Sequence, residues 1–123
     1  MNTLQTASGF DTEALRRGVE ERDAAALIGL YADDAELFLV DRQSQPSSPR
    51  SLKGREQIAD HLEEISGRDM THTLERVLVD GGHAAFLESC RYPDGVRVLC
   101  SAVLDLGDDG RIVRQTCVQA WDE

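Results

Sequence analysis

The chain has 123 residues, of which 41% are hydrophobic and 29% are charged, as is typical of one soluble globular domain. Its net charge of -10 disfavours contact with phosphate backbones and anionic lipids, so we expect no nucleic-acid partner and no membrane partner. No apolar run approaches the ~20 residues of a membrane span, and the N-terminus lacks the basic start and apolar core of a signal peptide.

The three cysteines, Cys90, Cys100 and Cys117, all fall in predicted strands. An odd number at wide spacing predicts no disulfide framework and indicates a reducing, cytoplasmic compartment. We interpret the cysteines as small buried hydrophobic residues, with redox or nucleophilic chemistry as the alternative.

The first half of the chain predicts three helices. Residues 1–9 are polar and expected to be flexible, and 10–123 are expected to form a single domain. Asp11 is a predicted N-cap for a helix that runs to about Arg22, with Gly18 allowing close approach. Asp23 is expected to cap a second helix with the sequence AAALIGLYA, which Asp33 and Asp34 end as a cap and turn pair. The apolar spacing of LKGREQIADHLEEISG predicts a third helix that stops at Gly67.

The rest of the chain predicts strands. AELFLV is apolar at both parities, which is typical of a strand covered on both faces. The segment 95–106 alternates strictly and is expected to be the central strand of a curved antiparallel sheet. Further strands are predicted over 71–79, 84–92 and 111–121. The Ser- and Pro-rich segment 41–51 is expected to be a flexible hairpin loop. This order predicts an α+β fold with the helices on one face of the sheet.

Three segments carry a family resemblance: LYADDAEL, KGREQIADHL and RIVRQTCVQAWDE. In their order and spacing they resemble the nuclear transport factor 2-like superfamily, and its SnoaL-like branch most of all, over about residues 10 to 122. The resemblance implies a cone-shaped roll in which a strongly bent antiparallel sheet wraps around three N-terminal helices. It also implies an apolar pocket at the wide end and a homodimer packed sheet to sheet. The loop 41–51 would lie at the opening of that pocket, where we expect it to act as a lid.

The superfamily includes ketosteroid isomerases, polyketide cyclases, epoxide hydrolases, dehydratases and non-catalytic binding domains. Aligned with the ketosteroid isomerases, the catalytic tyrosine, aspartate base and second acid fall on Leu15, Leu39 and Ala102. None of these side chains can move a proton or hold an enolate, so that mechanism is not expected.

Two residues are candidates for acid–base chemistry. Glu88 is the one charged residue on the even-numbered face of 84–92, which is otherwise mostly apolar. A carboxylate that faces an apolar pocket is disfavoured in its charged form, as suits a general acid or base. Its alternatives are a pair with an arginine or a place at the rim. His72, at the start of a strand, is the second candidate, with a surface position as its alternative.

We expect neither a metal nor a cofactor. No two of the three histidines have the spacing of metal ligands, and no carboxylate completes a set. His61 is expected to face solvent, and His83 is expected to lie on the surface at a turn.

The candidate pocket is predicted by assigning, on each strand, the alternate side chains that face inward. The last strand has two candidates for its inner face, and the sequence favours neither. One face carries Gln115, and the other carries Ile112 and Val118. Including the first of these faces, the predicted lining is Leu15, Leu39, Phe86, Cys90, Tyr92, Cys100, Ala102, Gln115, Cys117, Gln119 and Trp121.

The sequence favours a protein that binds a small apolar or polycyclic ligand. It is a candidate cyclase, isomerase or dehydratase for a ring-forming substrate, with Glu88 and His72 as the acid–base groups. The alternative is a non-catalytic ligand-binding or dimerisation module. A third hypothesis is a domain that binds a basic protein partner, as the acidic charge would allow.

Overall fold

A computed structural model describes residues 9–122, so all but Gly9 of the expected flexible segment 1–9 lies outside the described residues. None of the helices in this range has the length and apolar character that crossing a membrane requires. The elements in chain order are α2 (Thr12–Glu20), α3 (Ala24–Ile28), β1 (Tyr31–Val40), β2 (Arg50–Lys53), α4 (Arg55–Ser66), β3 (Thr71–Asp80), β4 (His83–Arg91), β5 (Arg97–Leu106) and β6 (Ile112–Trp121).

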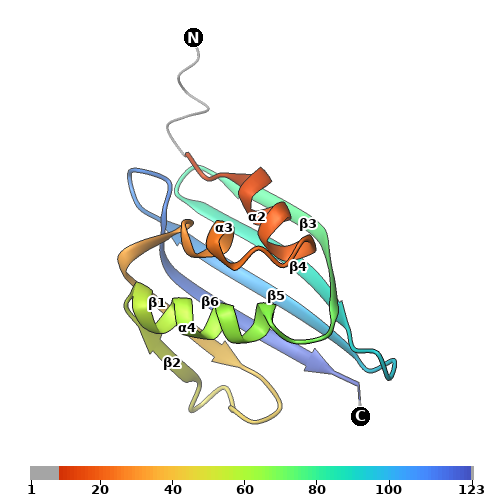
Figure 1. Ribbon diagram of the computed structural model, residues 1–123. Coiled ribbons are helices and arrows are strands. Elements are labelled where there is room, and N and C mark those ends of the chain that lie inside the picture. The colour runs from red at the N-terminus through yellow and green to blue at the C-terminus, as the bar shows by residue number, and fades with distance from the viewer. Residues whose placement is uncertain (1–8, 123) are drawn as a thin grey trace.

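The six strands form one sheet in the order β2-β1-β6-β5-β4-β3, and β5 and β6 lie in its middle. The three helices lie together on one face of the sheet (Figure 1). The expected α+β architecture, a bent sheet around three helices, is therefore confirmed. One strand pairing is parallel, that of β1 with β6, while the other four are antiparallel.

Two aspartates begin the first two helices as predicted. The Asp11 carboxylate accepts a hydrogen bond from the backbone N–H of Ala14 at 2.9 Å, and that of Asp23 accepts one from Ala26 at 3.2 Å. The expected length of the second helix is wrong, because α3 ends at Ile28 with Gly29 as its C-cap.

The chain after α3 is a strand, where a helix and a turn were expected. The Leu30 carbonyl accepts a hydrogen bond from the N–H of Ile112 at 2.8 Å, so the chain already pairs with β6 at this point. Asp33 and Asp34 are exposed in a bulge of β1, between its paired residues Tyr31 and Glu36. The cap and turn role predicted for these two aspartates is therefore wrong.

The segment after β1 is more ordered than its composition predicts. Arg50 and Ser51, expected to be loop, open strand β2, which pairs antiparallel with β1. Gly54 follows with φ 86°, a conformation that favours glycine, and α4 begins only after it. The third helix therefore starts three residues later than expected, and it ends at Gly67 as predicted.

The sheet has one buried face and one exposed face. On β5 the even-numbered residues are buried from Val98 to Leu104, as the alternation predicts. On β6 Gln115 and Cys117 are buried and Val118 is exposed, which decides the inner face of the last strand. Ile112 is nevertheless buried as well, because a bulge opposite Asp105 and Leu106 shifts the parity.

Cys100 and Cys117 form a disulfide between the neighbouring strands β5 and β6, with their Cα atoms 6.6 Å apart. The prediction of no disulfide is therefore wrong. Spacing along the chain does not reveal the pair, because the β5–β6 hairpin brings together residues 17 positions apart. Because two of the three cysteines are paired, the number of cysteines no longer supports a reducing compartment. Cys90 is free and buried, as expected of a small hydrophobic residue.

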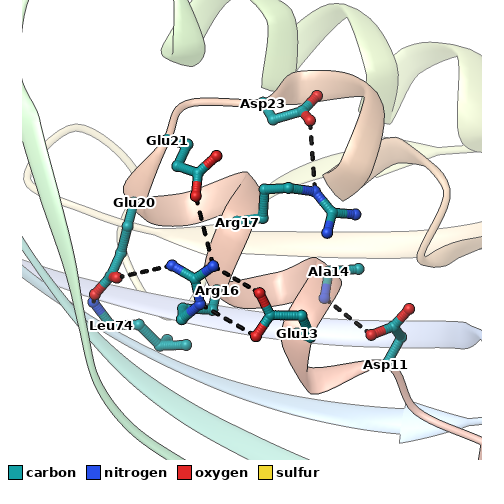
Figure 2. A network of polar contacts seen from close by, with 9 residues as sticks. All are labelled: Asp11, Glu13, Ala14, Arg16, Arg17, Glu20, Glu21, Asp23 and Leu74. Atoms are coloured by element: carbon teal, nitrogen blue, oxygen red, sulfur yellow. Dashed lines mark hydrogen bonds and ion pairs between the residues drawn. The ribbon is translucent and has the colours of Figure 1, made fainter.

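A polar network ties α2 to the edge of the sheet (Figure 2). Arg16 bonds to Glu13 at 2.6 Å and to Glu20 at 3.5 Å. Glu20 in turn accepts a hydrogen bond from the backbone N–H of Leu74 on the edge strand β3, at 3.0 Å. Glu20 therefore satisfies one backbone amide on the edge of β3 and attaches α2 to this edge strand.

Candidate functional site

A cavity of about 120 Å³ lies between the three helices and the buried face of the sheet. From the helices it is lined by Leu15 and Gly18 of α2, Leu27 of α3 and Leu62 of α4. Most of this wall is apolar, which suits the ring of a small organic molecule. The sheet supplies both apolar and polar side chains, and Arg22, His61, Ser66 and Arg68 add polar groups from α4 and the segments after α2 and α4.

Most of the predicted lining residues do face this cavity. Ala102 does not, because it is fully buried in the core beneath its larger neighbours. The predicted residues that line the cavity are Leu15, Leu39, Phe86, Cys90, Tyr92, Cys100, Gln115, Cys117, Gln119 and Trp121, and the two candidate acid–base residues, His72 and Glu88, line it as well.

Glu88 and His72 form a hydrogen-bonded pair inside the cavity. His72 lies directly opposite Cys90 on the neighbouring strand, and Glu88 precedes Cys90 by two residues, so all three share one face. The distance from His72 Nδ1 to Glu88 Oε2 is 2.7 Å, and their side chains are 5% and 15% exposed. An ionised carboxylate only accepts, so the Nδ1–H of His72 donates this bond.

The same carboxylate oxygen takes a second donor. Cys90 Sγ–H donates to Glu88 Oε2 at 3.3 Å, while Oε1 has no hydrogen-bond partner within residues 9–122. Two donors thus hold one oxygen, and the other is left for a ligand. Glu88 pairs with a histidine, so neither the arginine pair nor the rim position describes its surroundings.

These three residues also form a donor set that the sequence did not predict. The nearest ligand atoms of His72, Glu88 and Cys90 lie within 4.8 Å of one another. The strand pairing assembles the set, which is why spacing along the chain does not show it. The hydrogen bonds among the three groups explain their closeness, and we interpret the set as a positioning network for the carboxylate.

A second polar pair lines the cavity. The hydroxyl of Tyr31 donates to Oε1 of Gln115 at 2.5 Å, and both residues are buried. Gln115 is 5% exposed, and its Nε2 has no acceptor in the described part of the chain. Because a buried amide N–H without an acceptor is costly, this group is suited to donate to an oxygen of a ligand.

The surroundings keep the Tyr31 phenol and the Cys90 thiol protonated. Burial, and then the charge of Glu88, raise the pKa of Tyr31 well above its ordinary value. Burial and the Glu88 carboxylate likewise raise the pKa of the Cys90 thiol. At neutral pH the phenol and the thiol are therefore hydrogen-bond donors and are not nucleophiles.

Sequence reasoning missed five polar residues of the cavity: Arg22, Tyr31, His61, Ser66 and Arg68. Tyr31 falls in the segment AAALIGLYA, which was expected to be helical, so the sequence gave no sign that its side chain lines a cavity. His61 was expected to face solvent, but it is half-buried and lines the cavity from α4. His83 is exposed as predicted, 3.1 Å from Asp105. The adjacency of His61 to core-facing Leu62 was the one available signal.

A bent sheet around three helices, with polar groups inside an apolar cavity, defines a class of small α+β proteins with an enclosed site. The family model of the SnoaL-like domain matches residues 12–115, and the chain belongs to this family. No curated protein matches the sequence.

Solved structures show the same fold. An NTF2-like protein of unknown function from Mesorhizobium loti is 22% identical, with a TM-score of 0.75 over 89% of both chains. A proposed ketosteroid isomerase from Kribbella flavida is 23% identical, with a TM-score of 0.71 over 91% of this chain and 75% of that one. An epoxide hydrolase from M. tuberculosis is 18% identical, with a TM-score of 0.62 over 89% of this chain and 79% of the other.

The three positions aligned with the ketosteroid isomerase residues are apolar and buried here. Leu15 and Leu39 line the cavity, and Ala102 lies in the core. The two hydrogen-bonded polar pairs of this cavity come from other positions, on β1, β3, β4 and β6. Any proton transfer in this chain must therefore use a different set of residues.

Proposed function

We propose that the protein binds a small ring-containing carbonyl compound in the cavity and that Glu88 moves a proton of this ligand. The observation that carries the proposal is the Glu88 carboxylate, which is held at Oε2 by His72 and Cys90 and open at Oε1. A positioned carboxylate in an apolar cavity is the usual form of a general base in carbon acid chemistry.

The proposed step is removal of a proton from the carbon next to the ligand's carbonyl group. Oε1 of Glu88 takes the proton, and the electron pair of the C–H bond moves onto the carbonyl oxygen as an enolate. Nε2–H of Gln115 donates to that oxygen, and the bond from Tyr31 keeps the amide in place. In a ligand with a C=C bond conjugated to the enolate, return of the proton to the far carbon of that bond would give an isomerisation. Attack of the enolate on a second carbonyl of the same ligand, with the proton passing from Glu88 to the new alkoxide, would give a cyclisation.

His72 acts in this proposal as a positioning residue. Its Nδ1–H fixes one carboxylate oxygen at 2.7 Å before the ligand binds. No reacting atom needs to touch the imidazole, so its loss should weaken catalysis less than loss of Glu88.

The experiment is exchange of the α-protons of cyclohexanone in D2O, followed by NMR. General base catalysis contributes about 100-fold or more to a rate, so Glu88→Gln should lose at least that much of the catalysed exchange. The matched control is Glu75→Gln, because Glu75 is exposed on the neighbouring strand and bonds to Ser89. Exchange that is equally fast in Glu88→Gln and the wild type would contradict the assignment.

A non-catalytic binding module is the second candidate function. The apolar residues at the three positions aligned with the ketosteroid isomerases favour it, since the chain lacks that mechanism. Binding of cyclohexanone without catalysed exchange, in the wild type and in both variants, would select this function.

We also propose that two copies pack through the exposed face of the sheet. Leu99, Val103 and Val118 are 46%, 58% and 49% exposed on the neighbouring strands β5 and β6. Adjacent exposed apolar side chains of this kind mark an interaction surface. The homodimers implied by the family resemblance use the same face.

A further inference from the structure

The cavity opens into a second, larger space of about 450 Å³ at the end of α4. This outer pocket shares Leu39, His61, Arg68 and Trp121 with the cavity, so the two spaces adjoin. Its other walls include the segment after β1 and the turn between β4 and β5. A ligand whose ring lies in the cavity can therefore place a substituent in the outer pocket.

Three arginines line the outer pocket in a chain whose net charge is -10. Arg68 is bonded to Glu64 at 2.7 Å, so its charge is already paired. Arg42 and Arg50 have no carboxylate partner within residues 9–122. Arg50 has the same strand parity as the core residue Leu52, so it lies on the inner face of β2. Two guanidinium groups are thus available to an anion.

The two carboxylates of the outer pocket, Asp41 and Asp94, accept hydrogen bonds from backbone N–H groups of the turns in which they lie. Asp41 Oδ1 accepts from the backbone N–H of Gln43 and Ser44, each at 2.8 Å. Asp94 Oδ1 accepts from the backbone N–H of Val96 at 3.0 Å. These bonds hold both acids against the backbone, and their charges limit the pocket to a ligand of low negative charge.

The outer pocket also has an aromatic wall. The guanidinium of Arg42 lies 4.1 Å from the ring centre of Trp121, and the rings of Trp121 and Tyr92 stack at 5.9 Å. Stacking orients the guanidinium of Arg42 and leaves its edge free for hydrogen bonds.

His61 lines both spaces and lies within reach of the charge of Arg50. Burial, and then the charge of Arg50, lower the pKa of His61 to about 4, with Arg68 acting in the same direction and Glu64 and Asp41 opposing. The contribution of Arg50 to this shift agrees with the geometry, which places the Arg50 guanidinium near His61 in the outer pocket.

We propose that the ligand carries a carboxylate group, which binds Arg42 and Arg50 in the outer pocket while its ring lies in the cavity. A carboxylate is a planar monoanion that pairs with a guanidinium through two parallel hydrogen bonds. The substrate class is thus a ring ketone with an acidic side chain. This inference rests on the proposed function, because it assumes that the ring binds in the cavity.

The test compares two probes, 3-(4-oxocyclohexyl)propanoate and its neutral primary amide. Trp121 is the single tryptophan and lines both spaces, so its fluorescence reports binding. Charge-assisted bonds to the two arginines should make the acid bind about tenfold more tightly than the amide at low salt. Arg50→Gln should remove most of this preference, whereas Arg76→Gln, an exposed arginine of β3, should keep it.

The outcomes separate the two proposals. Equal affinity of acid and amide for the wild type, or an unchanged preference in Arg50→Gln, would overturn the carboxylate assignment and leave the ring-binding site standing. Failure of both probes to bind would overturn the proposed function, and the carboxylate assignment with it.

Discussion

At the scale of single residues, the site is a set of polar side chains that hold one another inside an apolar wall. Glu88 is fixed through one oxygen by His72 and Cys90, and Gln115 is fixed by Tyr31. Each pair leaves one group for a ligand: a carboxylate oxygen in the first and an amide N–H in the second. Hydrogen bonds of this kind position reacting groups before the ligand arrives.

Neutral His61 links the stability of the fold to pH. Burial, and then the charge of Arg50, lower its pKa from 6.5 to about 4, so below pH 6.5 the unfolded chain binds a proton that the folded chain does not. The free energy of unfolding is therefore highest above pH 6.5 and falls as the pH drops towards 4. We expect His61 to account for about 1–2 kcal/mol of this fall, because the imidazole is partly in solvent.

Urea unfolding of the wild type and of His61→Gln at several pH values between these limits checks the prediction. The glutamine variant cannot take up the proton, so its stability should fall less over the same range, while the carboxylates contribute equally to both proteins. The same pH dependence in the two proteins would show that His61 is not held neutral.

At the scale of elements, the cavity depends on how closely α2 and α3 approach each other. A Cβ atom built on Gly18 would lie 2.4 Å from Cγ of Leu27, so the two helices meet where the glycine has no side chain. Both residues also line the cavity. The sequence pattern indicated this close approach but not the residue that fills the space.

Gly18→Ala should therefore force Leu27 towards the cavity and lower the free energy of unfolding by about 1–3 kcal/mol. Gly29→Ala is the matched control, because Gly29 has a helical φ of -63° and an added Cβ would be 3.5 Å from its nearest neighbour. Thermal unfolding of both variants measures the difference. If Gly18→Ala were as stable as Gly29→Ala, the helices would not be packed as described.

The elements also show what the sequence could and could not predict. Strict alternation located β5 and its buried face, because a period of two leaves no other arrangement. The segment AAALIGLYA was expected to be one longer helix, but the hydrogen bond from Ile112 of β6 to the Leu30 carbonyl places the chain after α3 in the sheet. Strand β2 was missed for a similar reason, since Arg50 and Ser51 are held by the long-range pairing with β1 and not by their own propensities.

For the site, parity placed Glu88 on the inner face, and the strand register explains its contact with His72. That register, with a bulge after Leu74, is a property of the β3–β4 pairing and is not visible in the spacing of the residues. Tyr31 could not be found, because its position depends on the shortened helix. The arginines of the outer pocket come from separate segments that meet only in the folded chain.

At the scale of the whole molecule, the sheet has a buried face that lines the cavity and an exposed outer face. If two copies pack through the outer face, Val103→Asp should place a charge in the centre of an apolar contact and shift the protein to monomers. Val103 is 58% exposed in the single chain, so the variant should fold normally. Sedimentation equilibrium gives the mass, and circular dichroism checks the fold. A wild type that sediments as a monomer would contradict the dimer.

The proposed function requires that a small ring ketone binds between the helices and the sheet. NOEs between bound cyclohexanone and the methyl groups of the protein locate this ligand. We expect NOEs to Leu15, Leu37 and Leu39, which line the cavity. NOEs to Leu78, Leu99 and Val103 on the exposed face, with none to the cavity residues, would contradict it.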